Sequence, residues 1–315
     1  MTRSLWPWLR TLIAVGILGT LVWWHSTEAF VRALQAVDME SILVALAIGL
    51  FTTLCNAQRW CLVARRLGLR LPLGVAVGDY YQALFLNAVL PAGVLGDVHR
   101  AVSHGRDSGN VGKGVRAVVL ERVAGQAVII AAGVLVLLTR PALLPDPTTV
   151  ALVGLGLAIV TALAFRSRRW RRAITAEVRL VRDIWTGMVV LSAAALAGYV
   201  ALFFVAARTA GSHAPLTDLV PLAVLALLVM GLPVNVGGWG PREAATALAF
   251  GAVGLGAAQG LTVAVVYGVL TFVASLPGAG VLLLRPRLRV KEPQVLLERF
   301  DQRSQKVPAL AGRRQ

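Results

Sequence analysis

The chain alternates long uncharged apolar runs with shorter polar or basic segments. The apolar residues cluster in continuous stretches instead of alternating with polar ones, which indicates membrane helices and not the strands of a membrane barrel. The runs are residues 11–24, 42–56, 115–139, 150–165, 186–207, 216–230 and 261–284. Several approach or exceed the roughly 20 residues that cross a bilayer core, and the flanks of the shorter runs can complete the length. The pattern predicts an all-α, polytopic integral membrane protein.

Composition and charge agree with this prediction. The chain is 57% hydrophobic and 15% charged, whereas a soluble domain is about half apolar and about a quarter charged. The net charge of +16 comes from 31 Lys and Arg against 15 Asp and Glu. These basic residues crowd a few loops beside apolar runs, and no zinc-finger spacing or folded basic domain is present. We therefore expect anionic lipid head groups as partners and no nucleic acid.

The basic residues also assign sides to the loops, because Lys and Arg accumulate on the cytoplasmic side. Arg3 and Arg10 place the N-terminus inside. The segments 26–40 and 140–147 are poor in basic residues and are assigned outside. The segments assigned inside are residues 59–72, residues 99–116, residues 166–183 and the tail from residue 285. Segment 166–183 is predicted to lie on the cytoplasmic lipid surface as an amphipathic helix, and both termini are predicted to be cytoplasmic.

One apolar stretch has basic loops of the same predicted side at both of its ends. It covers residues 75–95 and includes much of the segment NAVLPAGVLGDVHR, residues 87–100. Such a stretch must be a re-entrant hairpin or a pair of short broken helices. Pro91 has no amide proton to donate, and Gly93 and Gly96 loosen a helix, so the freed backbone groups need protein or water around them.

A second hairpin is predicted near the C-terminus, around GLPVNVGGWGPREAA at residues 231–245. The preceding loop is assigned outside and the tail inside, so only one net crossing is allowed and this hairpin enters from outside. Both hairpins share the spacing P-x4-G-x3-R, which is formed by Pro91, Gly96 and Arg100 and by Pro233, Gly238 and Arg242. Inverted repeats with interrupted helices are typical of transporters. We predict about six full transmembrane helices plus two re-entrant or broken-helix hairpins in an inverted repeat.

The two arginines suggest anion binding. Half-helix N-termini carry partial positive charge, and arginine binds phosphate through two parallel hydrogen bonds. The alternative is that Arg100 and Arg242 only mark membrane interfaces. Glu121 could form a structural ion pair with Arg100 or Arg116, or it could titrate in proton coupling. The ion pair is the favoured interpretation, because loss of one partner of a buried pair is costly. Asp97 and Glu243 present the same choice.

Three motifs together resemble a known family. LNAVLPAGVLGDVHR, then VVLERVAGQ at residues 118–126, and then GLPVNVGGWGPREAA resemble the flippase-like transmembrane domain associated with lysylphosphatidylglycerol synthases. The resemblance covers roughly residues 10–285. It implies a multi-pass protein of the bacterial cytoplasmic membrane that moves an anionic or modified lipid between leaflets. Residues 1–285 would form this single domain, and residues 286–315 a basic cytoplasmic tail.

The resemblance also carries over individual positions. Those that match the motifs are Asn87, Pro91, Gly96, Asp97, Arg100, Glu121, Arg122, Pro233, Gly237, Gly238 and Glu243. With Arg242 added from the repeat, the candidate substrate-binding residues are Asn87, Asp97, Arg100, Glu121, Arg122, Arg242 and Glu243. The candidate turn residues are Pro91, Gly93, Gly96, Pro233, Gly237 and Gly238. Trp239 interrupts the small residues of the late motif and Pro241 precedes Arg242, a departure that bears on the second turn.

Other chemistries are poorly supported. The chain has neither H-E-x-x-H nor G-x-S-x-G, and GNVGKG at residues 109–114 lacks the full phosphate-loop spacing, so hydrolase and ATPase activity are not expected. No room is expected for an aminoacyl-transferase domain after the last helix. Cys55 and Cys61 are interpreted as packing residues, and no metal or cofactor is expected.

The expected partner is an anionic phospholipid or a polyprenyl phosphate, and the sequence names no protein partner. Two alternatives stay open. The chain could be an integral membrane enzyme or accessory subunit that acts on a lipid-linked cell-envelope substrate, with Asp97 or Glu243 as a base. It could also be a structural partner in a cell-envelope complex, in which case Arg100 and Arg242 would tolerate alanine.

Overall fold

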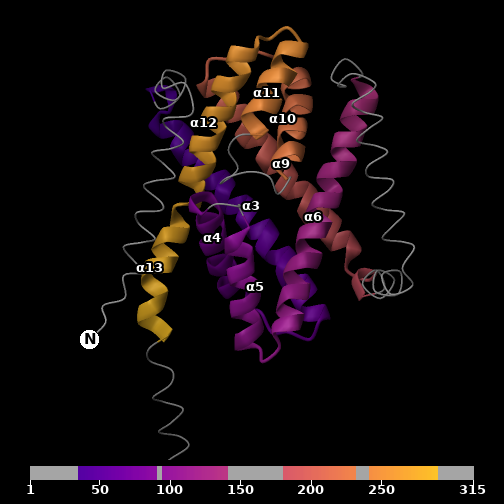
Figure 1. The fold of residues 1–315 in the computed structure, drawn as a ribbon, viewed down its shortest axis with the longest axis vertical. Coiled ribbons are helices and arrows are strands. Elements are labelled where there is room, and N and C mark those ends of the chain that lie inside the picture. The colour runs from indigo at the N-terminus through magenta and orange to yellow at the C-terminus, as the bar shows by residue number, and fades with distance from the viewer. Residues whose placement is uncertain (1–34, 91–93, 141–179, 232–240, 290–315) are drawn as a thin grey trace, which may run out of the picture.

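A computed structural model describes residues 35–90, 94–140, 180–231 and 241–289 (Figure 1). Every regular element in these ranges is a helix. The helices are α3 (Met39–Arg66), α4 (Leu73–Val89), α5 (Leu95–Asp107), α6 (Val111–Thr139), α9 (Trp185–Thr209), α10 (Leu216–Met230), α11 (Pro241–Ala252), α12 (Ala257–Ser275) and α13 (Pro277–Arg289). The all-α prediction is confirmed for the described residues.

Four helical stretches within the described residues are long and apolar enough to cross a membrane. They are Met39–Arg66, Val111–Thr139, Trp185–Thr209 and Ala257–Leu284. Each contains one of the apolar runs recognised in the sequence, and the shorter α10 coincides with the run at residues 216–230. The chain is therefore a multi-pass membrane protein. The runs at residues 11–24 and 150–165, and nearly all of the basic segment 166–183, lie outside the described residues.

Helix α3 is the central element, since it packs against α4, α6, α9 and α12. Its N-terminus is fixed by a capping box, in which the Asp38 carboxylate accepts from the Ser41 amide at 2.9 Å and the Asp38 amide donates to Ser41 Oγ at 3.2 Å. Arg65 and Arg66 in its last turn complement the helix dipole. Because α3 packs against helices of both halves of the molecule, it can contribute side chains to each half.

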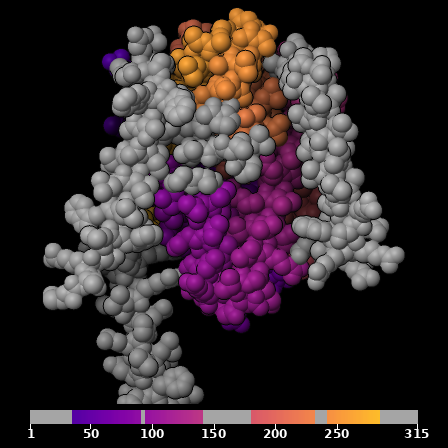
Figure 2. Space-filling model, viewed as in Figure 1, coloured from indigo at the N-terminus to yellow at the C-terminus, as the bar shows by residue number. Residues whose placement is uncertain are grey.

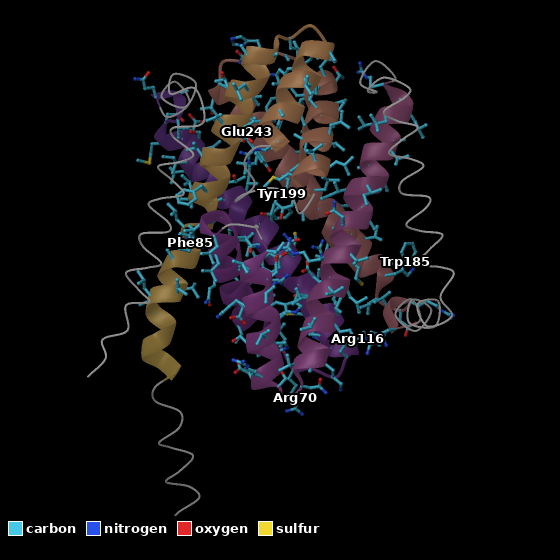
Figure 3. All side chains as sticks on the ribbon, viewed as in Figure 1. Arg70, Phe85, Arg116, Trp185, Tyr199 and Glu243 are labelled. Atoms are coloured by element: carbon cyan, nitrogen blue, oxygen red, sulfur yellow. The ribbon has the colours of Figure 1, made fainter. Side chains whose placement is uncertain are left out.

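The stretch that was predicted to be a hairpin consists of α4 and α5, which pack against each other. Arg70, just before α4, and Arg116, early in α6, both lie at the lower end of the view in Figure 3, as does the connection between α5 and α6 in Figure 1. The pair of helices therefore leaves and returns to one end of the bundle, as the loop charges required. Its depth in a membrane, and hence its re-entrant character, stays a prediction.

The second predicted hairpin lies in the other half of the molecule. Helices α10 and α11 pack against each other, and the connection between α11 and α12 is at the upper end of Figure 1. Arg140, after α6, pairs with Asp218 in the first turn of α10 at 3.7 Å. The two hairpins thus occupy opposite halves of the described structure, the placement that an inverted repeat needs. The repeat itself stays a prediction.

The connections inside both hairpins fall mostly outside the described residues. This applies to the candidate turn residues Pro91, Gly93, Pro233, Gly237 and Gly238. Gly96 is described, and it lies in the first turn of α5 and not in the connection. A Cβ atom at Gly96 would come within 2.1 Å of the Ala83 carbonyl oxygen on α4. Glycine at this position therefore permits the close backbone contact that joins the two helices.

Two apolar cores hold the described helices together. One joins α9, α10, α11 and α12 around Phe203, Leu219 and Tyr267. The other joins α3, α4, α5 and α6 around Trp60, Tyr80 and Val118, and α5 with the lower part of α6 forms much of the lower surface seen in Figure 2. Cys55 and Cys61 are buried and free, which agrees with their interpretation as packing residues. The candidate site is built against the second core.

Candidate functional site

A network of charged side chains lies inside the packing of α3, α5 and α6. Glu121 on α6 has no exposed surface and accepts from two guanidinium groups. Arg59 of α3 donates from Nε at 3.1 Å and also from Nη2, and Arg100 of α5 donates from Nη2 at 2.6 Å. The predicted ion pair between Glu121 and Arg100 is present in the structure. The second partner of this carboxylate is Arg59, and neither of these two ion pairs involves the alternative partner Arg116.

The network continues outward through Asp97. This carboxylate accepts from Arg100 Nε at 2.9 Å and from Arg122 Nη2 at 2.5 Å. Asn87 of α4 donates to Asp97 at 3.0 Å, and its side-chain oxygen accepts the Gly96 amide at 2.7 Å. Asn87 therefore caps the N-terminus of α5 from the neighbouring helix. The Asn87 side chain thus takes one of the amides at this positive helix end, and the expected binding of an anion there stays a prediction.

Burial changes steadily across the network. Glu121 is 0% exposed and the Arg100 side chain 1%, whereas the Asp97 side chain is 13% exposed and the Arg122 side chain 45%. Glu121 and Arg122 are sequence neighbours on α6, so one turn of helix carries both the innermost carboxylate and the outermost guanidinium. The network thus reaches from the protein interior to the surface.

Two aromatic rings also contact Arg100. Its guanidinium carbon lies 4.3 Å from the centre of the Tyr80 ring and 4.7 Å from that of Trp60. Such cation–π contacts contribute about 0.5–2 kcal/mol each, with the larger values in desolvated sites. The Tyr80 hydroxyl also lies 3.4 Å from Glu121. The orientation of Arg100 is therefore fixed by two aromatic rings as well as by two carboxylates.

Arg59 is the network residue that sequence reasoning missed. We expected it in a cytoplasmic loop, but it lies within α3 and is 4% exposed. Its Nη1 donates to Ser192 Oγ on α9 at 2.7 Å, and Gly125 on α6 leaves room for the guanidinium. Asn56, Arg59 and Val63 are buried at helical spacing. These positions continue the helical spacing beyond the apolar run at residues 42–56. This continued spacing was the feature of the sequence that could have predicted a buried Arg59.

The second pair of candidate residues lies on α11. Arg242 donates to its neighbour Glu243 from Nε at 3.0 Å and from Nη2, and both side chains are buried. The Arg242 guanidinium carbon lies 5.5 Å from the centre of the Tyr267 ring on α12. The structure thus joins Asn87, Asp97, Arg100, Glu121 and Arg122 in one network, while Arg242 and Glu243 pair with each other on a separate helix.

Tyr199 on α9 lies between these two regions. Its hydroxyl accepts from Asn56 of α3 at 2.7 Å, one helical turn before Arg59. Tyr199 also packs against the core that joins α9, α10, α11 and α12. That core includes Tyr267, whose ring contacts the Arg242 guanidinium. Figure 3 shows Tyr199 below Glu243 along the long axis. Among the described residues, no group of three His, Cys, Asp or Glu side chains could hold a metal ion.

The family of the chain follows from a comparison with known sequence families. The family described as the lysylphosphatidylglycerol synthase TM region matches residues 8–278. The chain belongs to this family. The matched region contains all of the charged network and the Arg242–Glu243 pair, so the resemblance first recognised from three short motifs extends over most of the chain. No curated protein and no solved structure matches the chain significantly.

Proposed function

We propose that this member of the lysylphosphatidylglycerol synthase TM family translocates an anionic or modified lipid, or a lipid-linked phosphate, between the leaflets of the bacterial cytoplasmic membrane. The single observation that carries the proposal is the charged network of Arg59, Arg100 and Arg122 with Asp97 and Glu121, set among helices of membrane-crossing length. Ionisable residues inside membrane segments are costly and mark substrate pathways.

The charge of the network favours an anion. Three guanidinium groups, those of Arg59, Arg100 and Arg122, face two carboxylates, those of Asp97 and Glu121, which leaves one positive charge in excess. A bound phosphate would compensate this charge, and arginine is well suited to hold it through charge-assisted hydrogen bonds. The lipid tails would meanwhile stay in the surrounding bilayer.

The gradient of burial supports access from one side of the network. A head group would meet the half-exposed Arg122 and the partly exposed Asp97 first, and the buried Arg100 afterwards. Because Arg122 and Arg100 share Asp97 as a partner, a phosphate that binds Arg122 would compete with this carboxylate and loosen its hold on both arginines. The head group would then move along the network as its phosphate replaces Asp97 as the partner of first Arg122 and then Arg100.

The contacts of the carboxylates support binding over catalysis. Asp97 accepts from two arginines and an asparagine, and Glu243 accepts from Arg242. Each carboxylate thus compensates a neighbouring cation, whereas a general base must have a lone pair directed at a substrate. The opposed hairpins suit alternating access to a central site, in which both termini of the chain would stay cytoplasmic.

Reconstitution tests the proposal. The purified chain is placed in vesicles that carry a trace of a fluorescent lipid probe. A membrane-impermeant quencher is added, and the fraction of the probe fluorescence that it removes is followed in time. We expect faster exchange between leaflets for a phosphatidylglycerol or polyprenyl-phosphate probe than in vesicles without protein. Absence of exchange for every anionic probe, with the protein shown to be folded by circular dichroism, would count against translocation.

A further inference from the structure

Three buried polar atoms lie together beside the charged network without a hydrogen-bond partner among the described residues. They are Trp60 Nε1 on α3 and Arg100 Nη1 and His104 Nε2 on α5. Their side chains are buried, at 0%, 1% and 5% exposure respectively. Buried polar groups nearly always have a partner, and leaving one without costs about 1–3 kcal/mol. Three such atoms on neighbouring side chains point to a polar group that binds beside them.

Trp60 contacts both of the other side chains. The Trp60 ring lies 4.7 Å from the Arg100 guanidinium carbon and 5.4 Å from the His104 ring, which it meets edge to face. Arg100 and His104 are four residues apart on α5, so their side chains are neighbours on one helix face. A single small group between them could contact all three.

The chemistry of the three atoms selects the type of group. The indole nitrogen of Trp60 and Nη1 of Arg100 can only donate hydrogen bonds, and His104 Nε2 donates when the ring carries its proton there. The other two nitrogens of Arg100 already donate to Asp97 and Glu121, so Nη1 is the part of this cation that is left to bind a ligand. Donors around a cation fit an oxyanion.

We propose that Trp60, Arg100 and His104 form an inner subsite for a phosphate oxyanion. The proposal rests on the proposed function, since the subsite would take the head-group phosphate after it passes Arg122 and Asp97. Trp60 and His104 are then binding residues that no motif in the sequence identified. Free phosphate and a lipid phosphate share the required chemistry, and the experiment separates the two sources.

The test follows the indole proton of Trp60 by nuclear magnetic resonance in detergent micelles. Tryptophan is labelled with ¹⁵N, and the Trp60→Phe variant identifies its signal among the eight tryptophans of the chain. Inorganic phosphate or a short-chain phosphatidic acid is then added, with phosphatidylcholine and sodium chloride as controls. We expect a downfield shift of this signal with phosphatidic acid and none with the controls. A shift with phosphatidic acid alone would assign the subsite to lipid, and a shift with both would include free phosphate.

The variants test the subsite by affinity. Trp60→Phe keeps a ring against Arg100 and removes only the donor. A hydrogen bond to a charged acceptor is strong enough that its loss should weaken phosphate binding about tenfold or more. Because this variant has no Trp60 signal, the affinities are measured by isothermal titration calorimetry. Trp185→Phe, which changes an exposed tryptophan, should leave the affinity unchanged. An unshifted Trp60 signal, as for a site that holds only internal water, would overturn the proposal, and so would equal shifts with chloride.

The two proposals fail in different ways. If the vesicle assay shows lipid exchange while the Trp60 signal does not respond to phosphate, translocation stands and the inner subsite is wrong. If the signal responds but no lipid probe exchanges, the chain binds phosphate without translocating it.

Discussion

The two buried arginines that share the P-x4-G-x3-R spacing have very different surroundings. Arg100 contacts carboxylates of its own helix and of α6, and the resulting network of three guanidinium groups and two carboxylates joins α3, α5 and α6 and reaches the surface at Arg122. Arg242 pairs with the adjacent Glu243 on the same helix. Both arginines lie on an aromatic ring.

The difference in surroundings leads us to expect different roles for the two arginines, although they share a spacing. A network with excess positive charge and graded exposure suits a substrate anion. The Arg242–Glu243 pair lies on α11 beside the Tyr267 ring of α12, and we expect it to hold these two helices together. The predictions below test whether the lower region is the substrate site and the upper region a structural one.

The largest effect is expected from Glu121→Gln. This change leaves the buried Arg59 and Arg100 without their common carboxylate, and breaking a buried charge pair in this way costs about 3–5 kcal/mol. The free energy of unfolding in mixed micelles measures it. Asp183→Asn is the matched control, because Asp183 pairs with Arg66 on the surface, where such pairs contribute about 0–1 kcal/mol. Equal losses in the two variants would contradict the account.

A double-mutant cycle at Arg242 and Glu243 tests the upper region. Arg242→Met and Glu243→Gln should each destabilise the protein, and the double variant should lose less than the sum, with a coupling of about 0.5–3 kcal/mol for residues in direct contact. The same unfolding assay gives all four values. Strict additivity would mean that the two side chains do not depend on each other, and the structural role assigned to the pair would be lost.

Gly96→Ala tests the contact that holds the lower hairpin together. The added Cβ would meet the Ala83 carbonyl oxygen at 2.1 Å and the Ala83 Cα at 2.7 Å, so α4 and α5 must separate. Overpacking of this kind costs about 1–3 kcal/mol. Gly74→Ala is the control on α4, since nothing lies within 4 Å of its Cβ position. A stable Gly96→Ala variant with full lipid exchange would show that close packing of the hairpin is not required.

The smallest effect is expected at the start of α3. The Ser41 amide donates to the Asp38 carboxylate and lowers the pKa of this group below its usual range. A lowered pKa means that the contribution to stability is present at neutral pH and is lost as the pH falls through the folded-state value. Asp38→Asn, which keeps the cap without the titration, should flatten this part of the stability profile. If the variant loses stability at low pH in the same way as the original protein, this loss comes from other carboxylates.

Much of the fold could be predicted from the sequence because apolar runs have a direct physical meaning in a membrane. Four predicted runs lie within helices of membrane-crossing length, and α10 has the predicted bounds. The basic loops placed both ends of the α4–α5 pair on one side, where Arg70 and Arg116 now lie. The distribution of Lys and Arg among the loops predicts which side each loop lies on, and this prediction needs no information about helix packing.

The candidate site was predictable only in part. The motifs identified Arg100, Glu121 and Asp97, but they gave no information on which side chains meet across helices. Arg59 was placed in a loop because basic residues near the end of a run usually lie at the interface, whereas its helix continues to Arg66 and buries it. Trp60 and His104 are ordinary core residues by sequence, and only tertiary packing reveals that their nitrogens lack partners.

The most direct test of the central claim is lipid exchange by Arg122→Gln beside Arg66→Gln. Both changes remove a half-exposed arginine that pairs with one aspartate. The Arg66–Asp183 pair lies on the surface, so Arg66→Gln should change the free energy of unfolding by less than about 1 kcal/mol. Asp97 is largely buried but keeps Arg100 as a partner, so Arg122→Gln should still fold, which the unfolding assay checks. Only Arg122 belongs to the network. We predict that Arg122→Gln slows exchange of an anionic lipid probe about tenfold or more, as expected for loss of a hydrogen bond to a charged group, while Arg66→Gln exchanges lipid at the original rate. Equal rates in the two folded variants would contradict the claim.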